Sequence, residues 1–240
     1  MTDIIRNTIN RLPLGFVFTT LDLPIEVGKQ ASANKILNNM VVSGQIRRLS
    51  KGRFYKPQIS EFGELLPDTF QTVKDQIEKN GKTIGYLTGY SVFNKFSLTT
   101  QVPTTTLQIG TRKEKKPIVR GNYRISFIIQ PNPITKKNIP ILQLLDCLRF
   151  FKIIPDSMPD DTCNRLLVLF KQLSDNHISM AKKLALKYNP STIALLGAIL
   201  ETINKDEDTS LLYKSLNHQS SYKLNISEEV LPTQKKWHIR

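Results

Sequence analysis

The apolar residues between positions 30 and 43 recur at three- and four-residue steps, which is the spacing of one face of an α-helix. The residues on this face are Ala33, Ile36, Leu37, Met40 and Val41. The opposite face is polar with a single cation, and it carries Ser32, Asn34, Lys35, Asn38 and Asn39. Gly44 follows, and glycine commonly ends a helix. The pattern predicts a helix with one apolar face and one polar, basic face.

A basic β-hairpin is predicted directly after this helix. Residues 45–49 and 54–55 have the composition of two short strands, and the turn 50–53 lies between them. The cations of the hairpin are Arg47, Arg48, Lys51 and Arg53. A polar-faced helix is therefore followed at once by a positively charged hairpin.

The segment before this helix predicts a helix, a short strand and a second helix, in that order. Residues 2–12 have helical spacing and end at Pro13, and residues 16–18 predict a short aromatic strand. Residues 19–22 can cap a second helix, which Pro24 and Gly28 would keep short and irregular. We therefore predict a winged helix-turn-helix domain over residues 1–60.

Such a domain has two interpretations. In the first it binds DNA: Asn side chains can pair with adenine edges in the major groove, Lys can contact guanine or phosphate, and the hairpin can contact phosphates. The DNA-binding residues would then be Ser32, Asn34, Lys35, Asn38, Asn39, Arg47, Arg48, Lys51 and Arg53. In the second, the domain has a structural or protein-binding role, since many surface hairpins carry Arg and Lys. The pattern leaves both open.

The remainder of the chain predicts a second domain over residues 68–240. Pro57 and Pro67 interrupt periodicity between the two domains. The predicted elements are a helix at 68–79, a helix or strand-helix at 84–96, strands at 104–109, 117–119 and 123–129 that form one sheet, and helices within 138–203. The predicted fold class is α/β, more strictly α+β: a winged helix followed by a mixed domain with a small sheet and a C-terminal helical bundle.

Three glycines in this second domain follow at four-residue steps. Gly81, Gly85 and Gly89 match neither the dinucleotide-binding nor the P-loop motif. We interpret them as sites where a helix packs closely against a neighbour.

A charged turn between the first two predicted strands is a weaker candidate site. It carries Arg112, Lys113, Lys115 and Lys116. Four cations on one turn repel each other, which favours contact with an anion or an acidic protein. The alternative is a solvated loop.

Composition points to the same classes of partner. The chain has 34 Lys and Arg residues and 20 Asp and Glu residues, a formal net charge of +14, and residues 1–60 contain nine basic and three acidic residues. Such an excess steers association with polyanions or acidic proteins.

Residues typical of catalysis or metal binding do not cluster in the sequence. His177, His218 and His238 are widely separated, and Cys147 and Cys163 lie in apolar helical patterns that favour buried thiols. We therefore predict no enzyme activity, no metal and no cofactor. With no leader and no apolar run of ~18 residues, a soluble, cytoplasmic protein that does not enter a membrane is expected.

Several short segments along the chain form an ordered set of motifs. They are 51–57 (KGRFYKP), 94–103 (NKFSLTTQVP), 106–109 (TLQI), 194–201 (ALLGAILE) and 231–233 (LPT), with Trp237 and Ile239. Taken in this order, they resemble AbiEi-like antitoxins, the transcriptional regulators of bacterial type IV toxin-antitoxin systems. The resemblance covers nearly the whole chain.

The resemblance implies a winged helix that represses its own promoter and a C-terminal antitoxin domain that opposes a nucleotidyltransferase-like toxin, directly or functionally. It implies no active site. Two copies on repeated half-sites are a further expectation, because repressors of this type commonly bind DNA as dimers.

Overall fold

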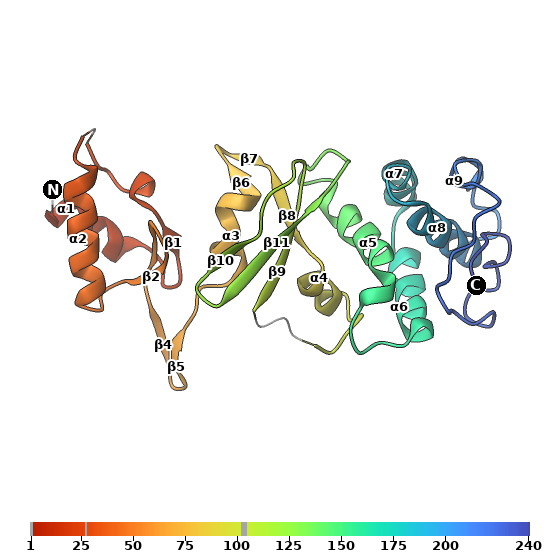
Figure 1. Ribbon diagram of the computed structural model, residues 1–240, viewed down its shortest axis with the longest axis horizontal. Coiled ribbons are helices and arrows are strands. Elements are labelled where there is room, and N and C mark those ends of the chain that lie inside the picture. The colour runs from red at the N-terminus through yellow and green to blue at the C-terminus, as the bar shows by residue number, and fades with distance from the viewer. Residues whose placement is uncertain (1, 27, 102–104) are drawn as a thin grey trace. The chain divides into compact units, whose positions relative to one another are not determined.

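The computed structural model describes residues 2–26, 28–101 and 105–240, which form a mixed α+β fold (Figure 1). The chain divides into two compact units, Met1–Asp75 with Ile118–Arg124 and Gln76–Pro117 with Ile125–Arg240. The predicted bounds were 1–60 and 68–240; in these units residues 61–75 and the distant segment 118–124 are grouped with the N-terminal elements. None of the helices formed by the described residues is long and apolar enough to cross a membrane.

The N-terminal elements of the first unit follow the predicted order. They are α1 (Thr2–Arg11), β1 (Val17–Phe18), the short 3₁₀ helix η1 (Thr20–Asp22), α2 (Gln30–Val42), β2 (Arg47–Ser50) and β3 (Arg53–Tyr55). The three strands form one antiparallel sheet in the order β1-β3-β2. The apolar faces of α1 and α2 bury Ile5, Ile9 and Leu37 in one core with Phe18 and Phe54.

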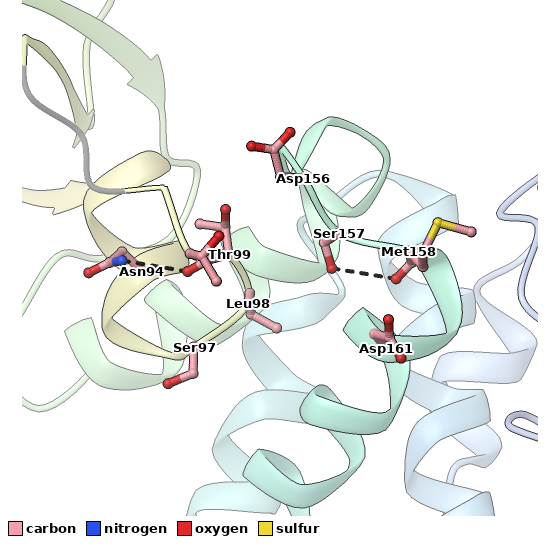
Figure 2. Close-up of a pocket in the computed structure, with 9 residues that line it drawn as sticks. Asn94, Ser97, Leu98, Thr99, Asp156, Ser157, Met158 and Asp161 are labelled. Carbon is pink, nitrogen blue, oxygen red and sulfur yellow. Dashed lines mark hydrogen bonds between the residues drawn. The ribbon is translucent and has the colours of Figure 1, made fainter.

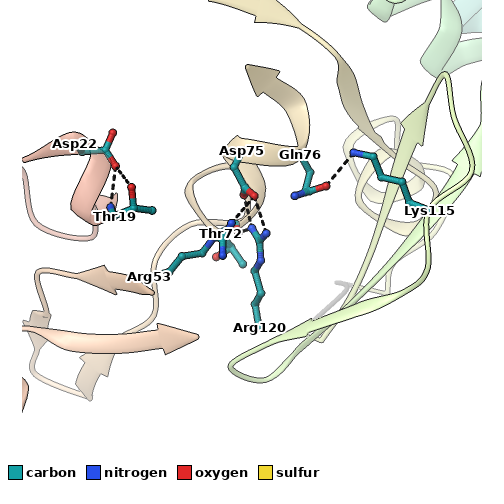
Figure 3. Close-up of polar contacts among 8 residues, drawn as sticks. All are labelled: Thr19, Asp22, Arg53, Thr72, Asp75, Gln76, Lys115 and Arg120. Carbon is teal, nitrogen blue, oxygen red and sulfur yellow. Dashed lines mark hydrogen bonds and ion pairs between the residues drawn. The ribbon is translucent and has the colours of Figure 1, made fainter. Parts of the chain in front are cut away.

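Local signals in the sequence explain where these elements begin and end. Thr19 and Asp22 form a capping box around η1, in which the Thr19 backbone amide donates to Asp22 Oδ2 at 2.8 Å (Figure 3). Gly44 has a φ of +78°, the left-handed conformation that ends α2, and Gly52 in the hairpin turn has a φ of +73°.

A second hairpin in the first unit was not predicted. Strands β4 (Gln58–Ser60) and β5 (Gly63–Leu65) form a separate two-stranded antiparallel sheet, where the sequence predicted only a boundary. Helix α3 (Thr69–Ile77) follows, and Asp68 Oδ1 caps it by accepting from the Gln71 amide at 2.9 Å.

The sheet associated with the second unit has the order β10-β11-β9-β8. Its strands are β8 (Gly85–Thr88), β9 (Thr106–Thr111), β10 (Ile118–Arg120) and β11 (Tyr123–Ile129), of which β10 and the start of β11 are grouped with the first unit. Strands β6 (Glu78–Lys79) and β7 (Lys82–Thr83) form a small hairpin, and α4 (Tyr90–Lys95) follows β8. Thr104 of the predicted strand and residues 102–103 of the quoted segment 94–103 lie outside the described residues.

The glycine spacing does not mark one face of a helix. Gly85 lies on strand β8, and Gly89, with a φ of +64°, lies between β8 and α4, so neither is a residue within a helix, although Gly85 does lie against the backbone of helix α3. A Cβ at Gly85 would lie 2.6 Å from the Gln76 carbonyl oxygen, which shows that close backbone approach explains this glycine.

The C-terminal half of the second unit is helical, as predicted for residues 138–203, and one short helix that was not predicted follows that range. Its elements are α5 (Ile139–Arg149), the 3₁₀ helix η2 (Phe151–Ile153), α6 (Pro159–Lys171), α7 (Asp175–Ala185), α8 (Pro190–Ile203) and α9 (Ser210–Lys214). Cys147 and Cys163 are buried free thiols. Burial raises the pKa of Cys163 to about 12 and that of Cys147 well above its usual value, so both are unreactive at neutral pH.

The C-terminal tail is held by its single tryptophan. Trp237 is fully buried, and its Nε1 donates to Glu201 Oε2 at 3.1 Å. Gly197 on α8 leaves room for the ring, because a Cβ there would lie 2.0 Å from Trp237 Cη2. Near the end of the chain, Tyr222 and Ile239 form an isolated parallel β-bridge.

Candidate nucleic-acid interface

Helix α2 exposes the polar face that its sequence predicted. Ala33, Leu37 and Met40 are buried, and the five polar residues of the opposite face are exposed: Ser32, Asn34, Lys35, Asn38 and Asn39. The face therefore presents amide, hydroxyl and ammonium groups, which are the groups that can bind base edges and phosphates.

Arg48 of the β2–β3 hairpin is joined to this face of α2. Its Nη2 donates to Asn38 Oδ1 at 2.6 Å, and its guanidinium lies 5.4 Å from the centroid of the Phe54 ring. Lys51 is exposed at the turn of the same hairpin. Together the five polar residues of α2, Arg48 and Lys51 make one surface, which we call the α2–hairpin surface.

Arg47 is directed to a carboxylate instead. Its Nε donates to Glu64 Oε2 at 2.9 Å, and its Nη1 donates to the Gly44 carbonyl at 3.1 Å. Tyr55 Oη donates to Glu64 Oε1 at 2.9 Å, and burial, followed by this hydrogen bond, raises the pKa of Tyr55 to about 12. Glu64 thus neutralises Arg47 and ties the β4–β5 hairpin to the three-stranded sheet.

Arg53 is also paired with a carboxylate (Figure 3). Its Nη2 lies 2.7 Å from Asp75 Oδ2, and Asp75 also binds both terminal nitrogens of Arg120. Arg120 is buried, and its Nη1 donates to the Thr72 carbonyl at 2.7 Å. Sequence reasoning missed both Asp75 and Arg120, since nothing in the pattern links positions 53, 75 and 120.

The charged turn 112–116 presents fewer free cations than its sequence suggested. Arg112 donates to the Pro131 carbonyl, and Lys115 Nζ donates to Gln76 Oε1 at 3.0 Å (Figure 3). Lys115 Nζ also lies 5.3 Å from the centroid of the Phe127 ring. Lys113 and Lys116 are exposed.

The second unit contains a pocket of about 760 Å³ (Figure 2). Asp156 and Asp161 contribute carboxylates, and Ser157 Oγ lies 2.6 Å from Thr162 Oγ1. Its other lining residues are Asn94, Ser97, Leu98, Thr99, Thr100 and Met158. Among these described residues there is no Lys, Arg, His or Cys, so the pocket lacks the charge that a phosphate would need.

Two of the three histidines come together in the fold. His218 Nδ1 lies 3.3 Å from His238 Nε2, whereas His177 Nδ1 lies 3.1 Å from Ser174 Oγ. In the part of the chain that the structure describes, no group of three or more His, Cys, Asp or Glu residues could hold a metal ion.

Comparisons with known proteins give a family and a fold. A family model described as "Family of unknown function (DUF6088)" matches residues 4–144. A solved structure, "Crystal structure of RV2827C protein from Mycobacterium tuberculosis", is similar with a TM-score of 0.50 and 10% sequence identity, over 93% of this chain and 84% of that one. At that identity the likeness extends to the fold alone. No curated protein matches the sequence.

Proposed function

The chain belongs to the DUF6088 family of unknown function, and we propose that it is a DNA-binding transcriptional repressor whose first unit is a winged helix-turn-helix. The observation that carries the proposal is the α2–hairpin surface, where an exposed polar helix face is continuous with the cations of a hairpin. In this arrangement α2 is the recognition helix and the β2–β3 hairpin is the wing.

In the proposed complex the two parts of the surface have different tasks. Asn34, Asn38 and Asn39 read base edges in the major groove, where an Asn amide matches adenine. Lys51 on the wing contacts a phosphate and so fixes the position of the protein along the duplex. Such a phosphate contact carries no sequence information. Arg48 holds Asn38 through its hydrogen bond and so positions the recognition helix relative to the wing.

The test is a fluorescence anisotropy titration of the full chain with the DNA upstream of its own gene. We expect tighter binding to this DNA than to a scrambled duplex, with log affinity falling linearly with log salt concentration. Equal affinity for both duplexes would contradict a sequence-specific repressor.

Removing the carboxylate that neutralises Arg53 is expected to strengthen binding. Asp75→Asn should raise DNA affinity about threefold to tenfold and steepen the salt dependence by about one phosphate contact, because Arg53 becomes free to meet the backbone. The same change should cost about 1–2 kcal/mol of folding free energy, since buried Arg120 loses its ionic partner. Titration and urea unfolding of one preparation measure both effects. An unchanged affinity would place Arg53 away from the DNA.

The resemblance to AbiEi-like regulators extends the proposal to an antitoxin. The protein would repress its own operon through the first unit and oppose a nucleotidyltransferase-like toxin encoded beside it. Co-expression with the neighbouring gene tests this: rescue of growth by this chain supports the proposal, and no rescue contradicts it.

A second candidate function is a protein-interaction module in which the winged helix is structural. Exposed Lys113 and Lys116 favour it, because they can meet an acidic protein. If the turn binds the toxin, K113E/K116E should abolish capture of the neighbouring gene product in a pull-down and leave DNA affinity within about twofold. Capture that survives this charge reversal would exclude the turn as the contact.

A further inference from the structure

The β4–β5 hairpin exposes apolar side chains that a small two-stranded sheet does not need. Phe62 at its tip is 99% exposed and Ile59 is 78% exposed. Within the described residues neither strand pairs with a third strand. A lone hairpin of this size is marginally stable in water, so its open faces point to an interaction surface.

The charge of this region is opposite to that of the rest of the chain. Residues 57–73 contain no Lys or Arg, although the chain has 34, and they include Glu61, Glu64 and Asp68. Two copies of a chain with a net charge of +14 repel each other, so self-association is least opposed where positive charge is absent. Glu61 at the tip also disfavours DNA as the occupant, because it would face phosphates.

A groove lies at the base of the same hairpin. It has a volume of about 400 Å³ and a mixed lining: the exposed apolar side chains of Leu14, Leu65 and Leu66, the ring of Phe16, and the polar residues Gln58, Asp68 and Gln71. The first unit therefore carries a protruding aromatic ring at the tip of the hairpin and, at its base, an open groove with apolar walls and polar edges that is large enough to accept a phenyl ring.

We propose that this region is the interface between two copies of the chain, with Phe62 of each copy inserted into the groove of the other. A two-fold axis places two hairpins side by side in opposite directions, so that the tip of one lies at the base of the other. The same two-fold axis therefore places Phe62 of each copy in the groove of the other, and these two identical contacts make the dimer isologous. The interface goes beyond the proposed repressor function and does not depend on it, since it involves no residue of the α2–hairpin surface.

The experiment is sedimentation equilibrium of the full chain over a micromolar concentration series without DNA. We expect a monomer–dimer equilibrium that Phe62→Ser weakens about 100-fold or more, because two buried phenyl rings are lost per dimer. Leu21→Ser is the matched control, since Leu21 is an 88% exposed residue of η1 in the same unit and should leave dimerisation unchanged. Circular dichroism and melting temperature verify that each variant is folded.

A mixing experiment tests the reciprocal arrangement. Leu66→Asp should also abolish dimerisation, because it removes an apolar wall of the groove and adds a second carboxylate beside Asp68. A mixture of the Phe62→Ser and Leu66→Asp chains should recover part of it, because the intact Phe62 of one chain meets the intact groove of the other. A monomeric wild type, a dimer insensitive to Phe62→Ser, or a mixture without recovery would each overturn the proposal.

Discussion

Replacing Lys35 and Lys51 together by Glu is expected to weaken binding to the upstream DNA about 100-fold and to reduce the salt dependence by about two phosphate contacts. Lys35 lies on the exposed face of α2 and Lys51 at the turn of the β2–β3 hairpin, so the double change reverses charge at both parts of the α2–hairpin surface. Both residues are exposed, and the fold should survive. The measurement is an anisotropy titration at several salt concentrations.

The matched control is charge reversal at Lys113 and Lys116, which lie on the turn 112–116. Both double variants lower the formal net charge of +14 by four. If general positive charge alone attracted DNA, the two variants would lose affinity equally. A specific interface requires K35E/K51E to lose far more, and an equal loss would disprove the placement of the site on the α2–hairpin surface.

The sequence predicted the elements of this surface because each is specified locally. The apolar spacing and Gly44 defined the helix that the structure places at Gln30–Val42, and the Ser-Lys-Gly-Arg turn defined the hairpin. The polar face followed from the same periodicity, since burying one side of a helix exposes the other. Whether these residues touch DNA stays a prediction.

Which hairpin cations are paired with carboxylates could not be predicted from the sequence, because the partners lie far apart along the chain. Arg47 and Arg53 look equivalent to Arg48 and Lys51 on the hairpin, yet they are paired with Glu64 and Asp75. These pairs require the β4–β5 hairpin and α3 to fold back onto the sheet. The β4–β5 hairpin was itself missed, because its strands are three residues long and lie between prolines that suggested a linker.

A buried polar network in the second unit is another feature that only the fold reveals. Asp146 is fully buried and accepts hydrogen bonds from Tyr86 Oη at 2.7 Å, Thr88 Oγ1 at 2.7 Å and Tyr188 Oη at 3.0 Å. Gln130 Nε2 in turn donates to both tyrosine oxygens, at 2.8 and 2.7 Å. The network joins α5 to strand β8 and to Tyr188, which follows α7, so it fixes how these elements pack against one another.

Replacing Asp146 by Leu is therefore expected to destabilise the second unit by about 3–5 kcal/mol, because three buried hydroxyl groups lose their acceptor. Urea unfolding followed by the fluorescence of Trp237 measures this unit, since Trp237 is the only tryptophan of the chain. Asp206→Leu is the control. Asp206 is exposed in the loop after α8, and its loss should change stability by no more than about 0.5 kcal/mol.

Replacing Asp146 by Asn separates the charge from the hydrogen bonds. Burial raises the pKa of Asp146, although the hydrogen bonds from Tyr86, Thr88 and Tyr188 lower it. A carboxyl group whose pKa is higher in the folded than in the unfolded state favours folding more as pH falls toward its unfolded pKa of about 3.9. The wild type should therefore gain stability relative to Asp146→Asn between neutral pH and pH ~4. If the wild type instead lost stability relative to Asp146→Asn as the pH falls, the hydrogen bonds from the hydroxyl groups would stabilise the ionised carboxylate by more than its desolvation costs.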